Sequence, residues 1–475
     1  MAEETRILAE FVCGARRDAM PADIFDLARL YVLDAIGSMI IGATKPWSQI
    51  AIDFATGAGA AGAGSCTVVG SPLVTAPQTA ALANGTMGHG FEIDDVHDES
   101  LTHPGIVVVP AAMAVAEKAG ASGAEFIMAV VLGYEVNGRV GLGVGAVSHM
   151  LSGFYPTGTS GTFGAAGAAA RLLQGTAEQC VHAFGIAGSF ASGIVEFAES
   201  GGMVKRLHAG RAAEGGVTAA YLAKSGFTGP TTVLEGKFGF CRTFSREPAV
   251  ARILDGLGSS YKIRETTIKP YACCSDIHPV IDALLDIKAR PGFDPRDVTH
   301  ILVESTAKLL ELNNIDGSTS MMAAQYSVPL TAAIVLFRDI RDPGTYQESL
   351  LHSEDLVAFQ RRVEMRRTDE FDRLYPKAIA ARVVVTTANG KKFEAVNRGA
   401  AGSIHNPLSA EQIEAKFMTL ADLILPRGRA SEIVRQVADI EAAKNIRGLT
   451  SLLRFDVRAP LQSPVRSAKT MAARS

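Results

Sequence analysis

Apolar and small residues recur at helical spacing over the first half of this chain, and this pattern constrains the fold more than any other feature. From about Ile7 to Leu257, alanine- and glycine-rich segments carry apolar residues three or four positions apart, with short glycine-bearing breaks between them. Small side chains let helix backbones approach closely, so a chain with 47 glycines can still pack densely. The pattern predicts a large helical domain, with clear helices at 24–41, 110–119, 123–140 and 162–173.

The pattern changes near Thr266. Runs typical of β-strands occur at 300–306 and 381–387, and the second is followed by Asn389-Gly390 and another run. Asn-Gly between two alternating runs is the strongest short-range signal for a hairpin. Helical periodicity returns after residue 409, so we predict a mainly α fold in which a smaller α/β domain is inserted into the helical one. The predicted boundaries are 1–265 and 401–458 for the helical domain, 266–400 for the α/β domain and 459–475 for a disordered tail.

Composition excludes several classes of partner. With 46 basic and 49 acidic residues the net charge is −3, so no global field recruits nucleic acid or an anionic membrane. No apolar run is long enough to span a bilayer, and the acidic N-terminus does not resemble a secretory signal, so we expect a cytoplasmic protein.

Six cysteines without a C-x-x-C pair argue against structural zinc. The G-x-G-x-x-G at 57–62 follows a helical pattern, so we expect no dinucleotide cofactor.

The segment from Gly88 to Gly105 holds the densest group of reactive side chains. Four carboxylates and two imidazoles fall between Asp94 and His103, at a spacing that fits no standard metal motif. We therefore favour acid–base or hydrogen-bonding roles over a metal site; the alternative is a solvated acidic loop that caps a helix starting near Pro110. The sequence Thr-His-Pro-Gly holds His103 in a turn, from which an imidazole can exchange protons near neutral pH.

A loop rich in hydroxyls and glycine, at 155–164, runs into a predicted helix. Backbone N–H groups at a helix N-terminus, with the hydroxyls of Thr157, Thr159 and Ser160 beside them, suit a carboxylate or a phosphate. Ordinary capping of the helix by Ser160 or Thr162 explains the same residues equally well.

Two basic segments are further candidates for binding an anion. In the first, Lys205 and His208 share a face if the segment is helical, and Arg211 is a third candidate; a solvated basic face is the alternative. In the second, near the predicted domain boundary, Lys269 suits an anion anchor and His278 a proton donor. A nucleophilic cysteine–histidine pair there is less favoured, because the two adjacent cysteines point in different directions and no orienting partner can be identified.

Seven motifs, in order along residues 5–450, carry a family resemblance. They are Glu92-Ile-Asp-Asp95, Thr102-His-Pro-Gly105, Pro156-Thr-Gly-Thr159 with Phe163-Gly-Ala-Ala166, Lys205-Arg-Leu-His-Ala-Gly-Arg211, Lys269-Pro-Tyr271 with His278-Pro279, Gln325-Tyr-Ser327 and Asn406-Pro-Leu-Ser409. Together they resemble the MmgE/PrpD family, which includes 2-methylcitrate dehydratase, cis-aconitate decarboxylase and iminodisuccinate epimerase. The resemblance implies a large all-helical domain, a smaller α/β lid, a homodimer and an active site between the two domains. It also implies that no metal or organic cofactor is required.

The same resemblance implies roles for particular residues. Catalytic roles would fall on Asp94, His103, Lys205, Lys269 and His278. The Thr157–Ser160 loop would line the pocket.

One position departs from the family pattern. Members close to the decarboxylase usually have histidine in the loop Gly-Phe-His-Pro-Thr-Gly, where this chain has Tyr155. A phenol with an ordinary pKa near 10 needs a nearby cation before it can act as a base.

The leading hypothesis is a cofactor-independent lyase of the dehydratase type, which abstracts a proton next to a carboxylate of a small di- or tricarboxylate. The alternatives are an epimerase that uses Tyr155 and Lys205 as opposed proton-transfer groups, and a non-catalytic carboxylate-binding member of the family.

Overall fold

The structure is a computed structural model, and it describes residues 3–57, 64–315, 320–346, 351, 353–375 and 378–458. The predicted tail at 459–475 and most of the G-x-G-x-x-G segment lie outside the described residues. Within the described part, helices dominate and sheets are small, so the predicted mainly α fold is confirmed. No helix of that part combines the length and apolarity needed to cross a membrane.

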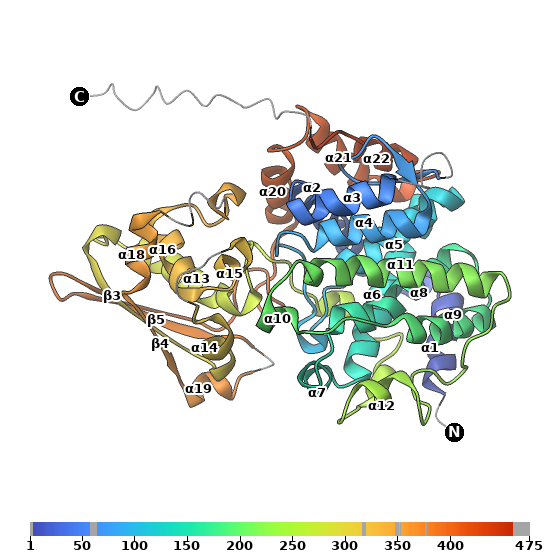
Figure 1. Cartoon of the computed structure of the whole chain (residues 1–475), viewed down its shortest axis with the longest axis horizontal. Helices are drawn as coiled ribbons and strands as arrows, with labels where there is room; N and C mark the ends of the chain where they lie inside the picture. The colour runs from blue at the N-terminus through green and yellow to red at the C-terminus, as the bar shows by residue number, and fades with distance from the viewer. Residues whose placement is uncertain are drawn as a thin grey trace.

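Six long or central helices form the body of the helical part, on the right of Figure 1. They are α2 (Asp23–Ala43), α4 (Pro77–Gly88), α5 (Gly105–Ala119), α6 (Gly123–Gly143), α8 (Pro156–Leu172) and α11 (Val204–Lys224). Glycine allows two of these helices to cross in close contact, as the sequence predicted. A Cβ on Gly210 of α11 would lie 2.2 Å from the carbonyl oxygen of Leu82 in α4, so only glycine fits at this crossing.

Shorter elements surround this body. They are α1 (Glu4–Gly14), α3 (Pro46–Thr56), α7 (Ala146–Leu151), α9 (Ala177–Phe190), α10 (Phe197–Ser200), α12 (Phe240–Phe244) and the small hairpin of β1 (Cys66–Thr67) and β2 (Val74–Thr75). The C-terminal helices α20 (Ala410–Ala421), α21 (Arg429–Ala438) and α22 (Arg447–Leu452) return to the helical part (Figure 1). There Phe417 of α20 packs against Gly37 of α2, and both ends of the chain share one apolar core.

A four-stranded sheet in the order β4-β3-β5-β6 forms the base of the smaller α/β part. Strands β3 (Val298–Ser305) and β4 (Val363–Arg367) run parallel, whereas β5 (Ala381–Thr387) is antiparallel to both β3 and β6 (Lys392–Asn397). The predicted hairpin is confirmed, and Gly390 at its turn has φ +77°. Among its described residues, the α-helices of this part are α13 (His278–Lys288), α14 (Ala307–Asn313), α15 (Met321–Gln325), α16 (Val328–Phe337), α18 (Glu354–Gln360) and α19 (Asp369–Asp372).

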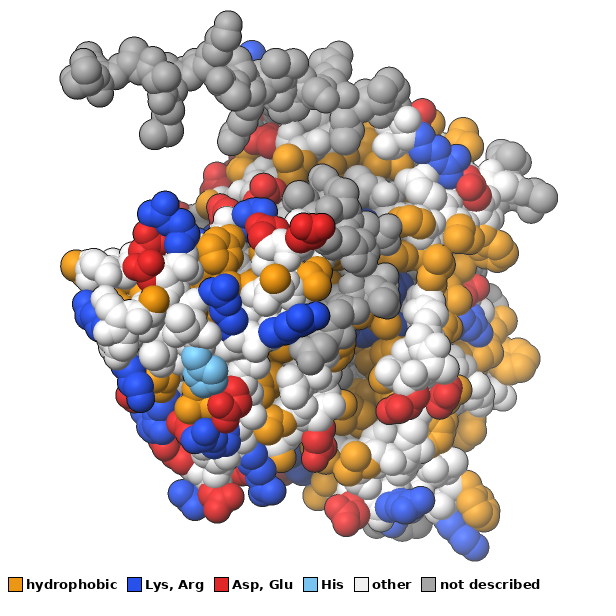
Figure 2. All heavy atoms as spheres, turned by 60° about the vertical axis from the view of Figure 1, so that its left-hand side comes forward, with side chains coloured by type: hydrophobic (Ala, Val, Ile, Leu, Met, Phe, Trp, Pro, Cys, Tyr) orange, Lys and Arg blue, Asp and Glu red, His pale blue; other side chains and the backbone are white. Residues whose placement is uncertain are grey.

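One face of the sheet is buried, because alternate residues of β5 are fully buried and the intervening ones only half-buried. Helix α13 packs against β5 and β6, and α16 packs on α13, which gives this part an apolar core of its own. The core also takes in Phe91 and Ile93 from the helical part. Figure 2 shows blue and red side chains interspersed over the face of the α/β part, in keeping with the small net charge.

Two helix starts differ from the sequence predictions. The helix predicted to begin near Pro110 begins at Gly105 and continues through the proline. The helix predicted to begin at Thr162 begins at Pro156, so Thr157, Thr159 and Ser160 lie in its first turns rather than in a loop. Proline is favoured at the first position of a helix, since its fixed φ suits the helix and no N–H is needed there. Capping by Ser160 or Thr162 is therefore wrong; Tyr155 occupies the cap position.

Candidate active site

The chain between α4 and α5 crosses the interior of the molecule. Every residue from His89 to His97 is buried, although this stretch contains three carboxylates. The alternative of a solvated acidic loop is therefore wrong for this stretch, although Asp95 does accept the N–H of Gly105 at the start of α5 (2.9 Å). Glu92 adopts φ +58°, a strained backbone conformation for a residue with a side chain. Such strain persists only where surrounding contacts impose it, and it is enriched at functional sites.

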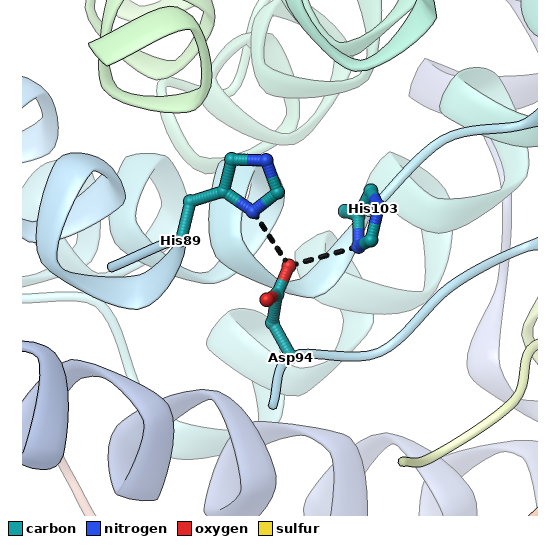
Figure 3. Close-up of side chains that lie close together, drawn as sticks. All are labelled: His89, Asp94 and His103. Carbon is teal, nitrogen blue, oxygen red and sulfur yellow. Dashed lines mark hydrogen bonds and ion pairs between the residues drawn. The ribbon is translucent and has the colours of Figure 1, made fainter. Parts of the chain in front are cut away.

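Asp94 lies at the centre of a cluster of two imidazoles (Figure 3). Its Oδ2 atom is 2.9 Å from Nδ1 of His89, at the end of α4, and 2.9 Å from Nδ1 of His103, just before α5. Both contacts converge on this one oxygen, while Oδ1 has no hydrogen-bond partner among the described residues. The side chains of Asp94 and His89 are fully buried, whereas that of His103 is 13% exposed. His103 is thus the imidazole that remains accessible.

Tyr155 extends this cluster. Its hydroxyl lies 2.7 Å from Nε2 of His89, and its ring stacks against that imidazole with centroids 6.0 Å apart. Because Tyr155 precedes the first residue of α8, the start of this helix places the phenol beside the cluster. Two residues further, Thr157 accepts a hydrogen bond from the backbone N–H of His103 at 3.2 Å. The order Asp94–His89–Tyr155 is a continuous hydrogen-bonded chain.

The protonation states of this chain follow from burial and charge. Burial opposes ionisation of Asp94, but the charges and hydrogen bonds of His89 and His103 hold its pKa well below the usual range. Burial lowers the pKa of His89 to about 4. A neutral His89 next to a carboxylate carries its proton on Nδ1, so Nε2 accepts from the Tyr155 hydroxyl. Burial also raises the pKa of Tyr155, and the nearby Glu92 charge adds to this, so the phenol remains protonated.

A second group of buried charges centres on Glu92. The ammonium group of Lys205, in the first turn of α11, forms an ion pair with the Glu92 carboxylate and donates to the Tyr326 hydroxyl at 2.8 Å. Lys269 donates to the backbone carbonyl of Glu92 at 3.4 Å. Tyr326 directly follows α15 in the α/β part, so this group joins both parts of the molecule.

Cations govern the electrostatics of this group. Burial opposes ionisation of Glu92, but Lys205 and Lys269 hold its pKa well below the usual range. Burial lowers the pKa of Lys205, and the positive charges of Arg206 and Lys269 add to the effect. Burial acts in the same direction on Lys269, but Asp94 and Glu92 outweigh it and raise its pKa. Both ammonium groups are buried, so an anion that reaches them meets little screening by water.

The structure brings together five predicted site residues, namely Asp94, His103, Tyr155, Lys205 and Lys269, with Thr157 at their edge. Others have different surroundings. The Thr159 hydroxyl lies 2.7 Å from Nε2 of His149 and, within the cluster, reaches only the backbone carbonyl of Tyr155, at 3.2 Å, while the Ser160 hydroxyl is buried without a partner among the described residues. Arg211 is 43% exposed and pairs with Glu214 at 2.7 Å, so the structure does not bring it to the buried charges.

His278 lies nearby but in a separate environment. Its imidazole is buried at the start of α13 and packs edge-on against Tyr271, with centroids 5.2 Å apart. It lines a cavity of about 490 Å³ together with Asp98 and Thr267, and this cavity is not lined by Asp94, His103 or Tyr155. Burial lowers the pKa of His278 to about 3, with a further contribution from the Lys269 charge, so its imidazole is neutral. Its role as proton donor stays a prediction.

His89, Asp94 and His103 are also the described residues that would best hold a metal ion. Their ligand atoms all lie within 4.8 Å of one another. However, Nδ1 of His89 forms a hydrogen bond with Asp94 at 2.9 Å, and a nitrogen that carries the shared proton has no lone pair for a metal. The contacts favour a hydrogen-bonded cluster over a metal centre.

Three residues of the site were missed by sequence reasoning. His89 and Glu92 lie in or beside motifs that the sequence analysis singled out, but neither was assigned a role. Tyr326 falls within the Gln325-Tyr-Ser327 motif, which was used only for the resemblance. Apart from the contact of His89 with Asp94, five positions away, their contacts span 66 to 234 positions of the chain, so no local pattern signals them.

Comparison with known proteins gives the class of this chain. The MmgE/PrpD N-terminal domain matches residues 6–252 and the C-terminal domain of the same family matches residues 271–440. The chain therefore belongs to the MmgE/PrpD family, as the ordered motifs predicted.

Individual relatives are similar over nearly their full length. A cis-aconitate decarboxylase from Aspergillus terreus is 29% identical, with 96% of this chain and 97% of the relative covered. The human cis-aconitate decarboxylase is 25% identical, over 95% of this chain and 94% of the relative. A cis-aconitate decarboxylase-like protein from Aspergillus oryzae is 26% identical over a similar extent.

Proposed function

We propose that this chain is a lyase that acts on a small di- or tricarboxylate by moving a proton at a carbon next to a carboxylate. One observation carries the proposal: the buried Asp94 joins two imidazoles and, through His89, a phenol, close to the ammonium groups of Lys205 and Lys269. Acid–base groups and fixed cations in a site sheltered from water are what enolate-type chemistry requires. The named activity of the relatives supports the same class of substrate.

In this mechanism the protein supplies both charge and a proton path. Lys205 and Lys269 stabilise the negative charge that develops on the substrate carboxylate as the neighbouring carbon becomes carbanion-like. Asp94 orients His103 through Nδ1, which leaves Nε2 to give or take the proton. Glu92 holds Lys205 in position.

Two lyase outcomes use the same site. In dehydration, the base removes a proton next to a carboxylate, and hydroxide leaves from the adjacent carbon and departs as water. In decarboxylation, the bond to one carboxylate breaks, CO2 leaves, and an acid group protonates the carbon that retains the electron pair. The names of the relatives make cis-aconitate the first substrate to assay. The second is 2-methylcitrate, the substrate of a dehydratase of the same family.

The test follows both acids by NMR in deuterated water. We expect formation of an alkene from the hydroxy acid, or loss of CO2 from cis-aconitate, at a rate that His103→Asn lowers by roughly 100-fold or more, because general acid–base groups typically contribute 10²–10⁴. His300→Asn is the matched control, since His300 is 45% exposed on β3 and remote from the cluster. Turnover that survives in His103→Asn would overturn the assignment of His103. Binding without any reaction of a range of polycarboxylates would favour the non-catalytic hypothesis.

A second candidate function is epimerisation of a dicarboxylate. It is favoured by Tyr155, which occupies the usual place of a histidine, and by the burial of Lys205, which lowers the pKa of its ammonium group. Solvent deuterium that enters the substrate without formation of an alkene or release of CO2 is the result expected of an epimerase.

We also propose that the protein is a homodimer and that it needs no metal or organic cofactor. Light scattering on the purified protein tests the first point. Activity that is unchanged after dialysis against EDTA supports the second, and activity lost on dialysis and restored by a divalent metal would overturn it.

A further inference from the structure

Arg206 has few partners for a buried cation. It is the third residue of α11 and only 2% exposed. Its Nη1 contacts the Met322 sulfur at 2.9 Å, and its guanidinium lies over the indole of Trp47 at 4.8 Å. A thioether is a weak acceptor, and arginine stays charged even in the interior. This guanidinium is therefore buried without a compensating anion in direct contact among the described residues.

The unpartnered donors are grouped. In the described part of the chain, neither Nε nor Nη2 of Arg206 has a hydrogen-bond partner, and the buried Nε1 of Trp47 has none either. Buried N–H groups without acceptors are rare and destabilising. Nε and Nη2 form one edge of the guanidinium, the edge that binds the two oxygens of a carboxylate side by side. These three N–H donors, two from Arg206 and one from Trp47, would be satisfied by a bound ligand with acceptor oxygens.

This group of donors borders the candidate active site. A Cβ added to Gly90, between His89 and Glu92, would lie 3.1 Å from Nε1 of Trp47. Arg206 directly follows Lys205 in α11, and its charge contributes to lowering the pKa of Glu92. The amino group of Lys45, two residues before Trp47, lies over the Phe91 ring at 4.1 Å and adds a further positive charge on this side.

We propose that Arg206 and Trp47 bind a carboxylate of the substrate that is remote from the reacting carbon, and so select acids with two or more carboxylates. The Nε–Nη2 edge of Arg206 receives both oxygens, and the indole N–H of Trp47 donates a third hydrogen bond. This inference rests on the proposed function, because the reacting end of the same acid occupies the cluster around Asp94 and Lys205.

The fluorescence of Trp47 can be used to measure binding at this contact. Trp47 is its single tryptophan, so fluorescence excited selectively from tryptophan reports on this place in the molecule. We expect cis-aconitate and citrate-type acids to change the emission with saturation, and a monocarboxylate such as crotonate to change it little. Charge-assisted hydrogen bonds contribute about 1.5–3 kcal/mol, so Arg206→Met should weaken binding of a tricarboxylate by roughly 10- to 100-fold.

Two further variants separate binding from folding. Arg206→Lys keeps the charge but removes the fork, and it should recover only part of the affinity. Arg435→Met removes an exposed arginine of a helix far along the chain and should leave binding unchanged.

In the absence of ligand, Arg206→Met should unfold at a higher temperature than the native chain, since it removes a buried charge without a partner. A purely structural role for Arg206 predicts a lower Tm.

The outcomes distinguish the inference from the proposed function. If a tricarboxylate is turned over and Arg206→Met retains native affinity and KM, the inference fails and the proposed function stands. If no acid is turned over, the proposed function fails, and the fluorescence titration still measures the anion site. If a tricarboxylate is turned over without any change in Trp47 emission, the assignment of Trp47 is overturned.

Discussion

At the scale of single residues, the site depends on one carboxylate that contacts two imidazoles. Asp94 fixes the tautomer of His89, which accepts a hydrogen bond from the Tyr155 hydroxyl, and the same carboxylate oxygen lies 2.9 Å from Nδ1 of His103. A histidine at position 155 could exchange a proton near neutral pH, whereas burial keeps the phenol protonated, so that it acts as a hydrogen-bond donor to His89. The tyrosine therefore places a protonated hydroxyl 2.7 Å from Nε2 of His89, where the phenol can serve as a proton donor.

Removal of the Tyr155 hydroxyl tests whether its contact with His89 contributes to proton transfer. Tyr155→Phe keeps the ring, which packs against Phe197 at 5.3 Å between centroids, but removes the hydroxyl that lies 2.7 Å from Nε2 of His89. We expect kcat to fall by roughly 100-fold with little change in Tm, because general acid–base groups typically contribute 10²–10⁴. Tyr221→Phe on α11, half-buried and away from the cluster, is the control. Unchanged kcat in Tyr155→Phe would exclude the hydroxyl from the proton path.

At the scale of elements, the ends of helices place the reactive groups. His89 follows the last residue of α4, His103 precedes α5, Tyr155 precedes α8, and Lys205 lies in the first turn of α11. Periodicity predicted α5 and α8, since apolar spacing is a property of neighbouring residues, whereas α4 was not predicted and α11 was considered only as a conditional helix. Their starts were less well predicted, because the signal at α8 was a proline at its first position among residues typical of loops.

The crossing of α4 and α11 controls the position of His89 and Lys205. Gly210→Ala would place a methyl group 2.2 Å from the Leu82 carbonyl oxygen and 2.3 Å from the Thr86 hydroxyl, so the helices must separate. We expect a loss of about 1–3 kcal/mol in the free energy of unfolding, measured in urea, and a fall in turnover.

Gly14→Ala is the control for this substitution. Gly14 ends α1 and has nothing within 4 Å of the added methyl group, so its replacement should leave stability unchanged or slightly raised. Equal stability of Gly210→Ala and the native chain would show that the crossing can adjust.

At the scale of the whole molecule, the site is assembled from segments far apart in the chain. Glu92 meets Lys205, 113 residues later, and Tyr326, 234 residues later, so both the helical and the α/β parts contribute. Several ionisable groups are enclosed as a result, and burial shifts them in opposite directions. It lowers the pKa of His278 to about 3 and raises that of Asp95 to about 8.

These two shifts predict opposite effects on the pH dependence of stability. His278 binds a proton more readily in the unfolded chain, so it makes stability fall as pH drops from about 6.5 towards 3. Asp95 holds a proton more readily in the folded chain, so it makes stability fall as pH rises from about 4 towards 8. Each contributes at most about 1.4 kcal/mol per pH unit.

Urea unfolding between pH 4.5 and 6 measures both contributions. Relative to the native chain, His278→Gln should make the free energy of unfolding rise less steeply with pH, and Asp95→Asn should make it rise more steeply. His300→Asn, with its exposed side chain, should leave the slope unchanged. Slopes that move in the same direction for both variants would contradict the assigned protonation states.

The sequence by itself determined the mainly α fold, the Asn389-Gly390 hairpin, the family and five of the residues that meet in the site. These depend on local spacing or on ordered motifs, which a chain displays before it folds. Only the tertiary structure decided which carboxylate pairs with which cation. It also showed that Arg211 lies outside the buried charges, and that His89, Glu92 and Tyr326 lie among them. It also left the donors of Arg206 and Trp47 without acceptors. Such pairings depend on which segments burial brings together, because a charge removed from water needs whatever partner the packing places beside it.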